Sequence, residues 1–204
     1  GNRPRLTGVS LCAIESRPTS ATLRALLRSM AQVECDKVLY FSPVRPEVLP
    51  EDIEHIAIPR FANISEYSTF MLLDFGQFVT SRHVLLIQWD GFIIDSSAWD
   101  DYFLEYDYVG APWPQFTPPY NVGNGGFSLR SRRLLTALRD PEFLADGPED
   151  VAICRTNRAM LEAKHDIRFA PHNVASRFSY EYGEKLTRTF GFHGLFNFPD
   201  VFKG

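Results

Sequence analysis

Residues 83–91 read HVLLIQWDG, a run of apolar residues that ends abruptly in Gln88, Trp89, Asp90 and Gly91. A short aliphatic run closed by a glycine is typical of a strand that is buried on both faces, as in a parallel sheet. Ligands of open α/β sheets bind beyond the carboxyl ends of the strands. A carboxylate at that place is a natural partner for a hard divalent cation. Asp-Gly is also among the commonest turn pairs, so the segment alone supports a turn and a ligand site equally.

The chain before this segment alternates strand and helix patterns. Residues 6–14 predict a first strand, and residues 37–42 and 54–59 predict two more. After the first strand, a helix is expected to begin at Thr19 or Ser20, because both are good N-caps. One face of this helix is apolar and consists of Leu23, Leu26, Leu27, Met30 and Val33. The order of these elements favours an α/β layered fold.

The chain on either side of residues 83–91 predicts further short elements. Asn63, with Glu66 three residues later, forms a helix-capping signature. The helix that follows carries a stripe made of Tyr67, Phe70, Met71, Phe75 and Phe78. The other predicted helices cover residues 99–106, 131–139 and 151–164, and the other predicted strands cover residues 108–111, 127–129 and 167–170. We therefore expect residues 1–204 to form one α/β domain.

The composition limits the partners and the compartment of the protein. A net charge of −4 and a pI near 5.7 provide no electrostatic footprint for a nucleic acid. The three cysteines, Cys12, Cys35 and Cys154, are odd in number and unpatterned, which favours reduced thiols. The sequence shows no signal peptide and no apolar run long enough to span a bilayer. We expect a cytoplasmic protein without a nucleic-acid partner or a transmembrane segment.

Two loops follow the predicted strand at residues 108–111. Residues 112–120 hold four prolines, so they predict a stiff loop in which Trp113 and Tyr120 either bind a ligand or only pin the loop. Residues 123–126 read GNGG, and their glycines allow a close approach of the backbone to a bulky group. The spacing does not match the dinucleotide fingerprint, so this loop alone identifies no ligand.

Two further places carry candidate chemistry near the end of the chain. Glu149 and Asp150 open a predicted helix, where the helix dipole favours acidic residues for structural reasons alone. His193 lies between Gly191-Phe192 and Gly194, with little crowding of its side chain. A histidine in this setting is well placed to reach a metal or a phosphate, and an exposed histidine without a role is the alternative.

Taken in order, these motifs resemble those of the GT-A glycosyltransferases. More narrowly, the chain is similar to a bacterial glycosyltransferase-like family. The shared strings are QWDGF at residues 88–92, YDYVGAPW at 106–113, GNGGFSLRSR at 123–132 and EDVAIC at 149–154. The resemblance covers most of the chain from about Ser65 onward. It implies a GT-A fold, which is a Rossmann-like, mixed but mostly parallel sheet flanked by helices, with a nucleotide-binding half at about residues 1–95 and an acceptor-binding half at about residues 96–204.

The resemblance also implies a divalent-metal site. Residues 88–90 occupy the position of the D-x-D motif, with Gln88 where many relatives have aspartate. Asp90 and His193 are the implied ligands of Mn²⁺ or Mg²⁺, and mixed oxygen and nitrogen ligands suit Mn²⁺ as well as Mg²⁺. Such an ion would neutralise charge on a departing nucleoside diphosphate.

The same resemblance implies roles for the remaining candidates. Asp150 matches the catalytic base of inverting enzymes, which accepts the proton of the acceptor hydroxyl. The residues implied in donor binding are Arg17, Tyr67, Gln88, Trp89, Gly125 and Gly126. The residues implied in acceptor binding are Trp113, Tyr120 and Glu149.

The sequence therefore predicts an inverting hexosyltransferase that uses a nucleotide sugar, with a UDP-linked donor as the first expectation. Its acceptor is a glycan or another hydroxyl compound, as in polysaccharide biosynthesis. One alternative is a nucleotidyltransferase acting on sugar phosphates, although residues 12–18 (CAIESRP) lack the glycine-rich phosphate loop of that class. Another is a non-catalytic domain that binds a glycan or nucleotide as part of a larger protein.

Overall fold

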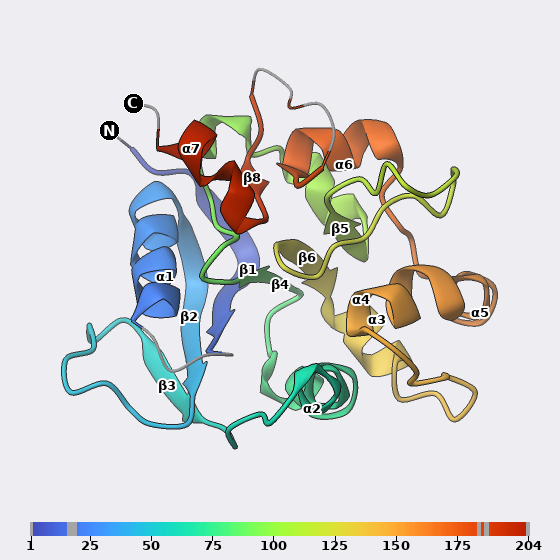
Figure 1. The fold of residues 1–204 in the computed structure, drawn as a ribbon, viewed down its shortest axis with the longest axis horizontal. Coiled ribbons are helices and arrows are strands. Elements are labelled where there is room, and N and C mark those ends of the chain that lie inside the picture. The colour runs from blue at the N-terminus through green and yellow to red at the C-terminus, as the bar shows by residue number, and fades with distance from the viewer. Residues whose placement is uncertain (1, 16–19, 183–184, 186–187, 203–204) are drawn as a thin grey trace.

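The apolar runs form a six-stranded sheet in the computed structural model, which describes residues 2–15, 20–182, 185 and 188–202 (Figure 1). The strands are β1 (Arg5–Ile14), β2 (Glu34–Ser42), β3 (Glu54–Ala57), β4 (His83–Ile87), β5 (Tyr108–Gly110) and β6 (Ser128–Ser131). Their order is β3-β2-β1-β4-β6-β5. The first four are parallel, and β6 is antiparallel to both of its neighbours. The sheet is therefore mostly parallel, and β4 lies inside it, as the sequence predicts.

Strand β4 is buried at all five positions because each of its faces lies against a separate hydrophobic core. Leu85 and Ile87 point into one core, and Val84 and Leu86 point into the other. Successive side chains of a strand point to opposite faces. This explains why residues 84–87 are a continuous apolar run and do not alternate with polar residues.

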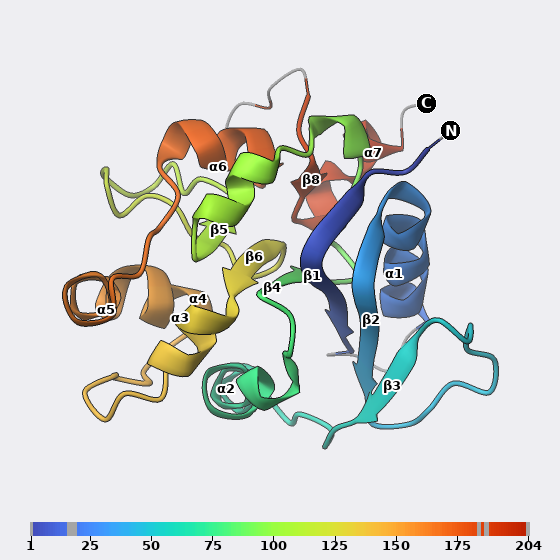
Figure 2. The same cartoon turned by 180° about the vertical axis from the view of Figure 1, so that it is seen from behind.

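Helices cover both faces of the sheet, as Figure 2 shows from behind. Helices α1 (Ala21–Gln32) and α6 (His172–Phe178) contribute residues to the core of one face. The other core receives residues of α2 (Ile64–Thr69), η1 (Phe70–Asp74), η2 (Phe75–Phe78), α3 (Arg132–Ala137), η5 (Ala152–Thr156) and α5 (Arg158–His165). The remaining elements are η3 (Ser96–Ala98), η4 (Asp101–Glu105), α4 (Glu149–Val151), β7 (Ser179–Tyr180), β8 (Gly191–Phe192), η6 (Leu195–Asn197) and α7 (Phe198–Val201). In the described part of the chain, none of these helices has the length and apolarity needed to cross a bilayer.

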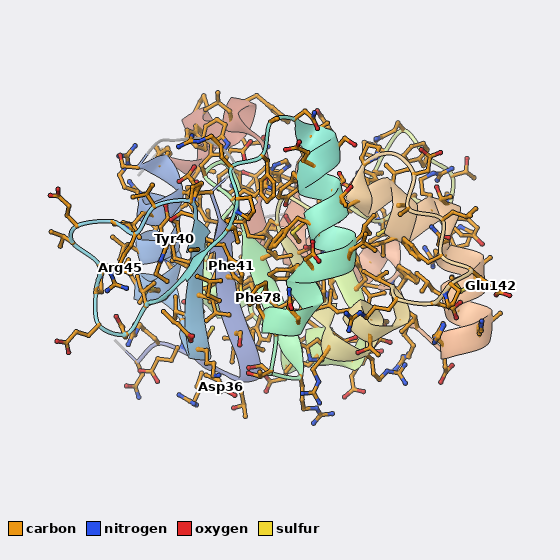
Figure 3. All side chains as sticks on the ribbon, turned by 90° about the horizontal axis from the view of Figure 1, so that it is seen from below. Asp36, Tyr40, Phe41, Arg45, Phe78 and Glu142 are labelled. Carbon is orange, nitrogen blue, oxygen red and sulfur yellow. The ribbon has the colours of Figure 1, made fainter. Side chains whose placement is uncertain are left out.

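The aromatic stripe predicted after Asn63 packs α2, η1 and η2 onto the sheet. Asn63 accepts a hydrogen bond from the backbone N–H of Glu66 at 3.0 Å, which confirms the predicted cap. Figure 3 shows Phe78 beside Phe41 of β2, and their ring centroids are 5.4 Å apart. This packing holds Tyr67, at the start of the same helical segment, near the end of β4.

The structure corrects the predicted helix over residues 151–164. Helical structure begins earlier, with α4, and passes through the π-helical turn η5 before α5. The backbone N–H of Asn157 donates to Ala152 O, five residues back, at 2.9 Å. Five-residue spacing is the mark of a π turn, in which one extra residue enters the helix. Within the predicted helix over residues 99–106, the structure likewise forms only the short turn η4.

The predicted strand over residues 167–170 is also wrong, because this segment forms only a single parallel bridge, between Phe169 and Tyr108. Pro171 follows directly and has no N–H to extend a ladder, and α6 begins at the next residue. At the other end of the chain, Ser20 flanks α1 without a capping side-chain bond, and Thr19 lies outside the described residues.

The burial of His83 at the start of β4 predicts a loss of stability in acid. Burial lowers the pKa of its imidazole, and the contact of Nε2 with Tyr106 O at 3.0 Å only partly opposes this effect. The unfolded chain binds a proton at this residue with a pKa of about 6.5, so below that pH it binds more protons than the folded protein. The contribution of His83 to stability is therefore present above about pH 6.5 and is lost as the pH falls.

We expect the free energy of unfolding of His83→Gln to fall less between pH 8 and pH 5 than that of the wild type. Urea titrations at the two pH values measure this difference. His172→Gln is the matched control, because His172 is exposed, and it should keep the wild-type pH dependence. Equal pH dependence in the wild type and His83→Gln would contradict the assignment.

Candidate functional site

The end of β4 is a tight turn that carries three candidate residues, Gln88, Trp89 and Asp90. Gln88 N donates to Gly91 O at 2.8 Å, and Gly91 N donates to Gln88 O at 3.1 Å. Trp89 and Asp90 lie at the tip of this turn, so the turn predicted from Asp-Gly is present. The indole of Trp89 contacts Phe198, with ring centroids 6.3 Å apart. Because the carboxylate of Asp90 projects from the same turn, the turn and the candidate ligand are compatible.

Asp90 and His193 meet although they are far apart in the sequence. The distance between His193 Nε2 and Asp90 Oδ1 is 3.3 Å, and the backbone N–H of Gly194 donates to Asp90 O at 2.8 Å. The side chains are only 19% and 15% exposed. Burial alone would lower the pKa of His193, but the adjacent carboxylates of Asp90 and Glu181 raise it to about 9.

The glycine loop, residues 123–126, lies against His193 and also against the acidic residues Glu149 and Asp150. A Cβ atom on Gly126 would be 2.2 Å from the His193 ring, and one on Gly125 would be 2.1 Å from Glu149 Oε1. Only glycine fits at either position without displacing these neighbours. The N–H of Gly125 donates to Asp150 Oδ2 at 3.0 Å. Asp150 and His193 therefore contact neighbouring residues of one loop, and the structure gathers the separate sequence motifs.

Tyr67 and Gln88 form another edge of the same group. The amide Nε2 of Gln88 donates to the hydroxyl of Tyr67 at 3.2 Å. Burial raises the pKa of Tyr67, and the charges of Glu149 and Asp150 act in the same direction. The tyrosine is therefore a neutral hydroxyl that lies close to the acidic start of α4.

Behind the glycine loop lies a buried ion pair that the sequence analysis missed. Arg130 Nη1 is 2.9 Å from Glu149 Oε2, and the exposed fractions of the two side chains are 0% and 6%. A second bond, from Arg130 Nη2 to Glu149 Oε1, is 3.1 Å long. The carboxylate of Glu149 faces Arg130 in this arrangement, so its predicted contact with an acceptor stays a prediction. The sequence signal for this pair is an arginine in the middle of the short strand that follows the glycine loop, residues 128–131 (SLRS).

The proline-rich loop is fixed by its own aromatic residues and by two arginines. Trp113 is buried, and its ring fills the space in which a Cβ of Gly123 would lie. Arg155 donates to Tyr120 O at 2.6 Å, and the guanidinium of Arg158 lies 5.0 Å from the centroid of the Tyr120 ring. These contacts match the structural alternative for the loop, and the acceptor roles of Trp113 and Tyr120 stay predictions.

One predicted residue lies outside the described structure, and two residues that were not predicted lie beside the site. Arg17 lies outside the described residues. Within the described ranges, no group of three or more His, Cys, Asp or Glu side chains is arranged to hold a metal ion. Asp90 and His193 are therefore a pair of candidate ligands. Asn124, which belongs to the glycine loop but was not named as a candidate, and Glu181, which lies in none of the sequence motifs, also adjoin the site.

A protein-family model described as "Protein of unknown function (DUF5672)" matches residues 52–193, which include all of the gathered site residues. This chain belongs to the DUF5672 family. No curated protein matches it significantly in sequence. For this DUF5672 protein, the matched range begins shortly before β3 and ends at His193.

A solved structure supports the fold class of this DUF5672 protein. It is similar to a glycosyltransferase involved in the glycosylation of the major capsid of PBCV-1, with a TM-score of 0.56, 9% sequence identity and 92% of each chain covered. Another similar structure is A197 from STIV, with a TM-score of 0.43, 16% identity and 79% of each chain covered. At this identity the first similarity bears on the fold alone. The predicted GT-A-like α/β class is confirmed, and a glycosyltransferase-like fold follows for this chain.

Proposed function

We propose that this protein transfers a sugar from a nucleotide-sugar donor, with UDP as the first expected nucleotide, to a hydroxyl acceptor with inversion at the anomeric carbon. The observation that carries the proposal is the contact between Asp90 and His193 next to a glycine loop that also binds Asp150. The loop separates a candidate site for the diphosphate from a candidate base. Inverting transfer needs both groups, on either side of the reacting sugar.

Asp150 is the proposed base. The hydrogen bond from Gly125 to Oδ2 orients this carboxylate, and Val151 N donates to Oδ1 at 2.8 Å. The carboxylate accepts the proton of the acceptor hydroxyl while the oxygen attacks the anomeric carbon and the bond to the diphosphate breaks. The proposed donor-binding residues are Arg17, Tyr67, Gln88, Trp89, Gly125 and Gly126, and the proposed acceptor-binding residues are Trp113, Tyr120 and Glu149.

The residues at the end of β4 fit a Mn²⁺ or Mg²⁺ ion. Asp90 Oδ1 is buried without a well-aligned hydrogen-bond donor in the described structure, and it lies 3.3 Å from His193 Nε2. Ligand atoms bound about 2.0–2.2 Å from one ion lie about 3 Å apart, so both atoms can face the same ion. Magnesium commonly takes only one or two protein carboxylates together with substrate phosphates. Such an ion supplies Lewis-acid neutralisation of the diphosphate.

Thermal unfolding with a panel of nucleoside diphosphates and nucleotide sugars, with and without Mn²⁺, tests the binding part of the proposal. A ligand at 100 times its Kd stabilises the folded state by about 2.7 kcal/mol. We expect at least one uridine ligand to raise the Tm in the presence of Mn²⁺. Asp90→Asn should remove the part of the Tm increase that depends on Mn²⁺. Asp74→Asn, at an exposed position of η1, should leave that part unchanged.

Turnover decides between the proposal and its alternatives. Release of nucleoside diphosphate from a nucleotide sugar, by transfer or by slow hydrolysis, is the expected result. Pyrophosphate released from a nucleoside triphosphate and a sugar phosphate would instead indicate a nucleotidyltransferase. Binding with no turnover of any donor would indicate a non-catalytic domain.

A further inference from the structure

His193 lies between two carboxylates, and the second belongs to Glu181. The distance between His193 Nδ1 and Glu181 Oε1 is 3.2 Å, on the side of the ring opposite to Asp90. The Glu181 side chain is 13% exposed. The proposed function gives Glu181 no role, and residues 179–182 (SYEY) match none of the motifs in the sequence.

The short strands β7 and β8 explain why these two residues meet. They pair in parallel, with Ser179 opposite Gly191 and Tyr180 opposite Phe192. Glu181 and His193 are the next residues of the two strands, so they leave the pair at the same end. The N–H of His193 donates to Tyr180 O at 2.9 Å, which keeps this register through the histidine.

Glu181 is itself held by two asparagines. Asn124 of the glycine loop donates from Nδ2 to Glu181 Oε2, and its Oδ1 accepts from Gly126 N at 3.1 Å. Asn197 donates to the backbone oxygen of Glu181 at 3.0 Å and to that of His193 at 2.8 Å. Oε2 of Glu181 thus has a hydrogen-bond partner in the glycine loop, while Oε1 lies 3.2 Å from Nδ1 of the imidazole, a buried atom that has no well-aligned hydrogen bond in the described structure.

We infer that Glu181 is a positioning residue for His193, an inference that rests on the proposed metal-dependent function. In this role Glu181 would accept the proton of Nδ1 when the metal binds, so that the lone pair of Nε2 could hold the ion beside Asp90. Metal-binding histidines commonly donate their second ring N–H to a carboxylate, which fixes the tautomer and the ring orientation. The link through Asn124 also ties the orientation of this ring to the glycine loop.

Binding of Mn²⁺ in the presence of UDP, measured by electron paramagnetic resonance, tests this inference without an activity assay. Loss of such a carboxylate commonly weakens metal binding by about 10- to 100-fold, and we expect a loss of this size for Glu181→Gln. Glu181→Asp should recover part of the affinity, because it keeps a carboxylate. Glu142→Gln, at a position that is 67% exposed, should bind as the wild type does.

A double-mutant cycle shows whether Glu181 acts through His193 or binds the metal directly. If it acts through His193, Glu181→Gln should cause little further loss in a His193→Gln background. Equal losses in both backgrounds would overturn the inference, as would wild-type Mn²⁺ affinity in Glu181→Gln. We expect Glu181→Gln to unfold in urea without metal at a midpoint near that of the wild type. If the fraction of Glu181→Gln that is unfolded accounts for all of its lost Mn²⁺ binding, the inference is also overturned.

The same titrations separate this inference from the proposed function. If the wild type binds no Mn²⁺ with any nucleoside diphosphate, the proposed metal-dependent function fails and the inference fails with it. If the wild type binds Mn²⁺ and Glu181→Gln binds equally well, only the positioning role is wrong.

Discussion

Asp150→Asn is expected to lower the rate of sugar transfer by about 10²–10⁴-fold, the usual contribution of a general base. Asparagine has nearly the same size and keeps one side-chain oxygen that can accept the 3.0 Å hydrogen bond from Gly125 N. The glycine loop should therefore keep its conformation, while the amide cannot take up the proton of the acceptor. The loss should lie in kcat, with donor affinity close to that of the wild type.

Steady-state kinetics with a saturating donor measure this effect once a donor is known from the binding panel. Asp146→Asn is the matched control, because Asp146 lies in the exposed segment just before α4, and it should transfer at the wild-type rate. Donor binding to Asp150→Asn, measured by thermal shift, shows that the site is intact. Transfer by Asp150→Asn at the wild-type rate would refute the assignment of the base.

Glu149→Leu is expected to destabilise the protein by about 3–5 kcal/mol, which is typical when one partner of a buried ion pair is removed. Arg130 is completely buried, so its charge would remain in the interior without a partner. Burial alone would lower the pKa of Arg130, but the charge of Glu149 and its hydrogen bond raise it, and the guanidinium stays protonated. The variant should also displace Gly125, which lies against Glu149 Oε1.

Urea unfolding followed by tryptophan fluorescence measures the loss of stability. The double variant Arg130→Met with Glu149→Leu removes both charges and should recover most of it, since apolar replacements of buried ion pairs are often neutral. Glu34→Gln breaks an exposed pair with Arg3, 3.3 Å long, and should cost less than about 1 kcal/mol. A cost for Glu149→Leu as small as that of Glu34→Gln would contradict the structural role of the pair.

The longer elements of this fold could be predicted because their signals are local. The apolar runs at residues 6–14 and 83–87 form β1 and β4, and Asn63 begins α2 as expected. Two-residue strands such as β7 and β8 have no periodicity to detect, and their pairing depends on the whole C-terminal arrangement. For that reason the contact between Glu181 and His193 could not be predicted.

The sequence predicted which motifs lie together at the candidate site, but not the contacts that support them. Ordered motifs indicated Asp90, Asp150 and His193, and the structure brings them to one glycine loop. A local pattern does not give the direction of a strand, so the predicted mixed sheet did not specify that β6 is the antiparallel strand. Arg130 lies on β6, so without the position of this strand in the sheet its ion pair with Glu149 could not be predicted either.

The π turn η5 constrains how the length of this segment can change. Asp150 lies just before the turn and Arg158 just after it, where Arg158 donates to Pro119 O at 2.7 Å. The π turn absorbs its extra residue without turning the flanking helical segments, whereas one further inserted residue would rotate one end relative to the other by about 100°. Asp150 and Arg158 could not both keep their partners after such an insertion. Further insertions here should therefore be less tolerated than substitutions that preserve the spacing.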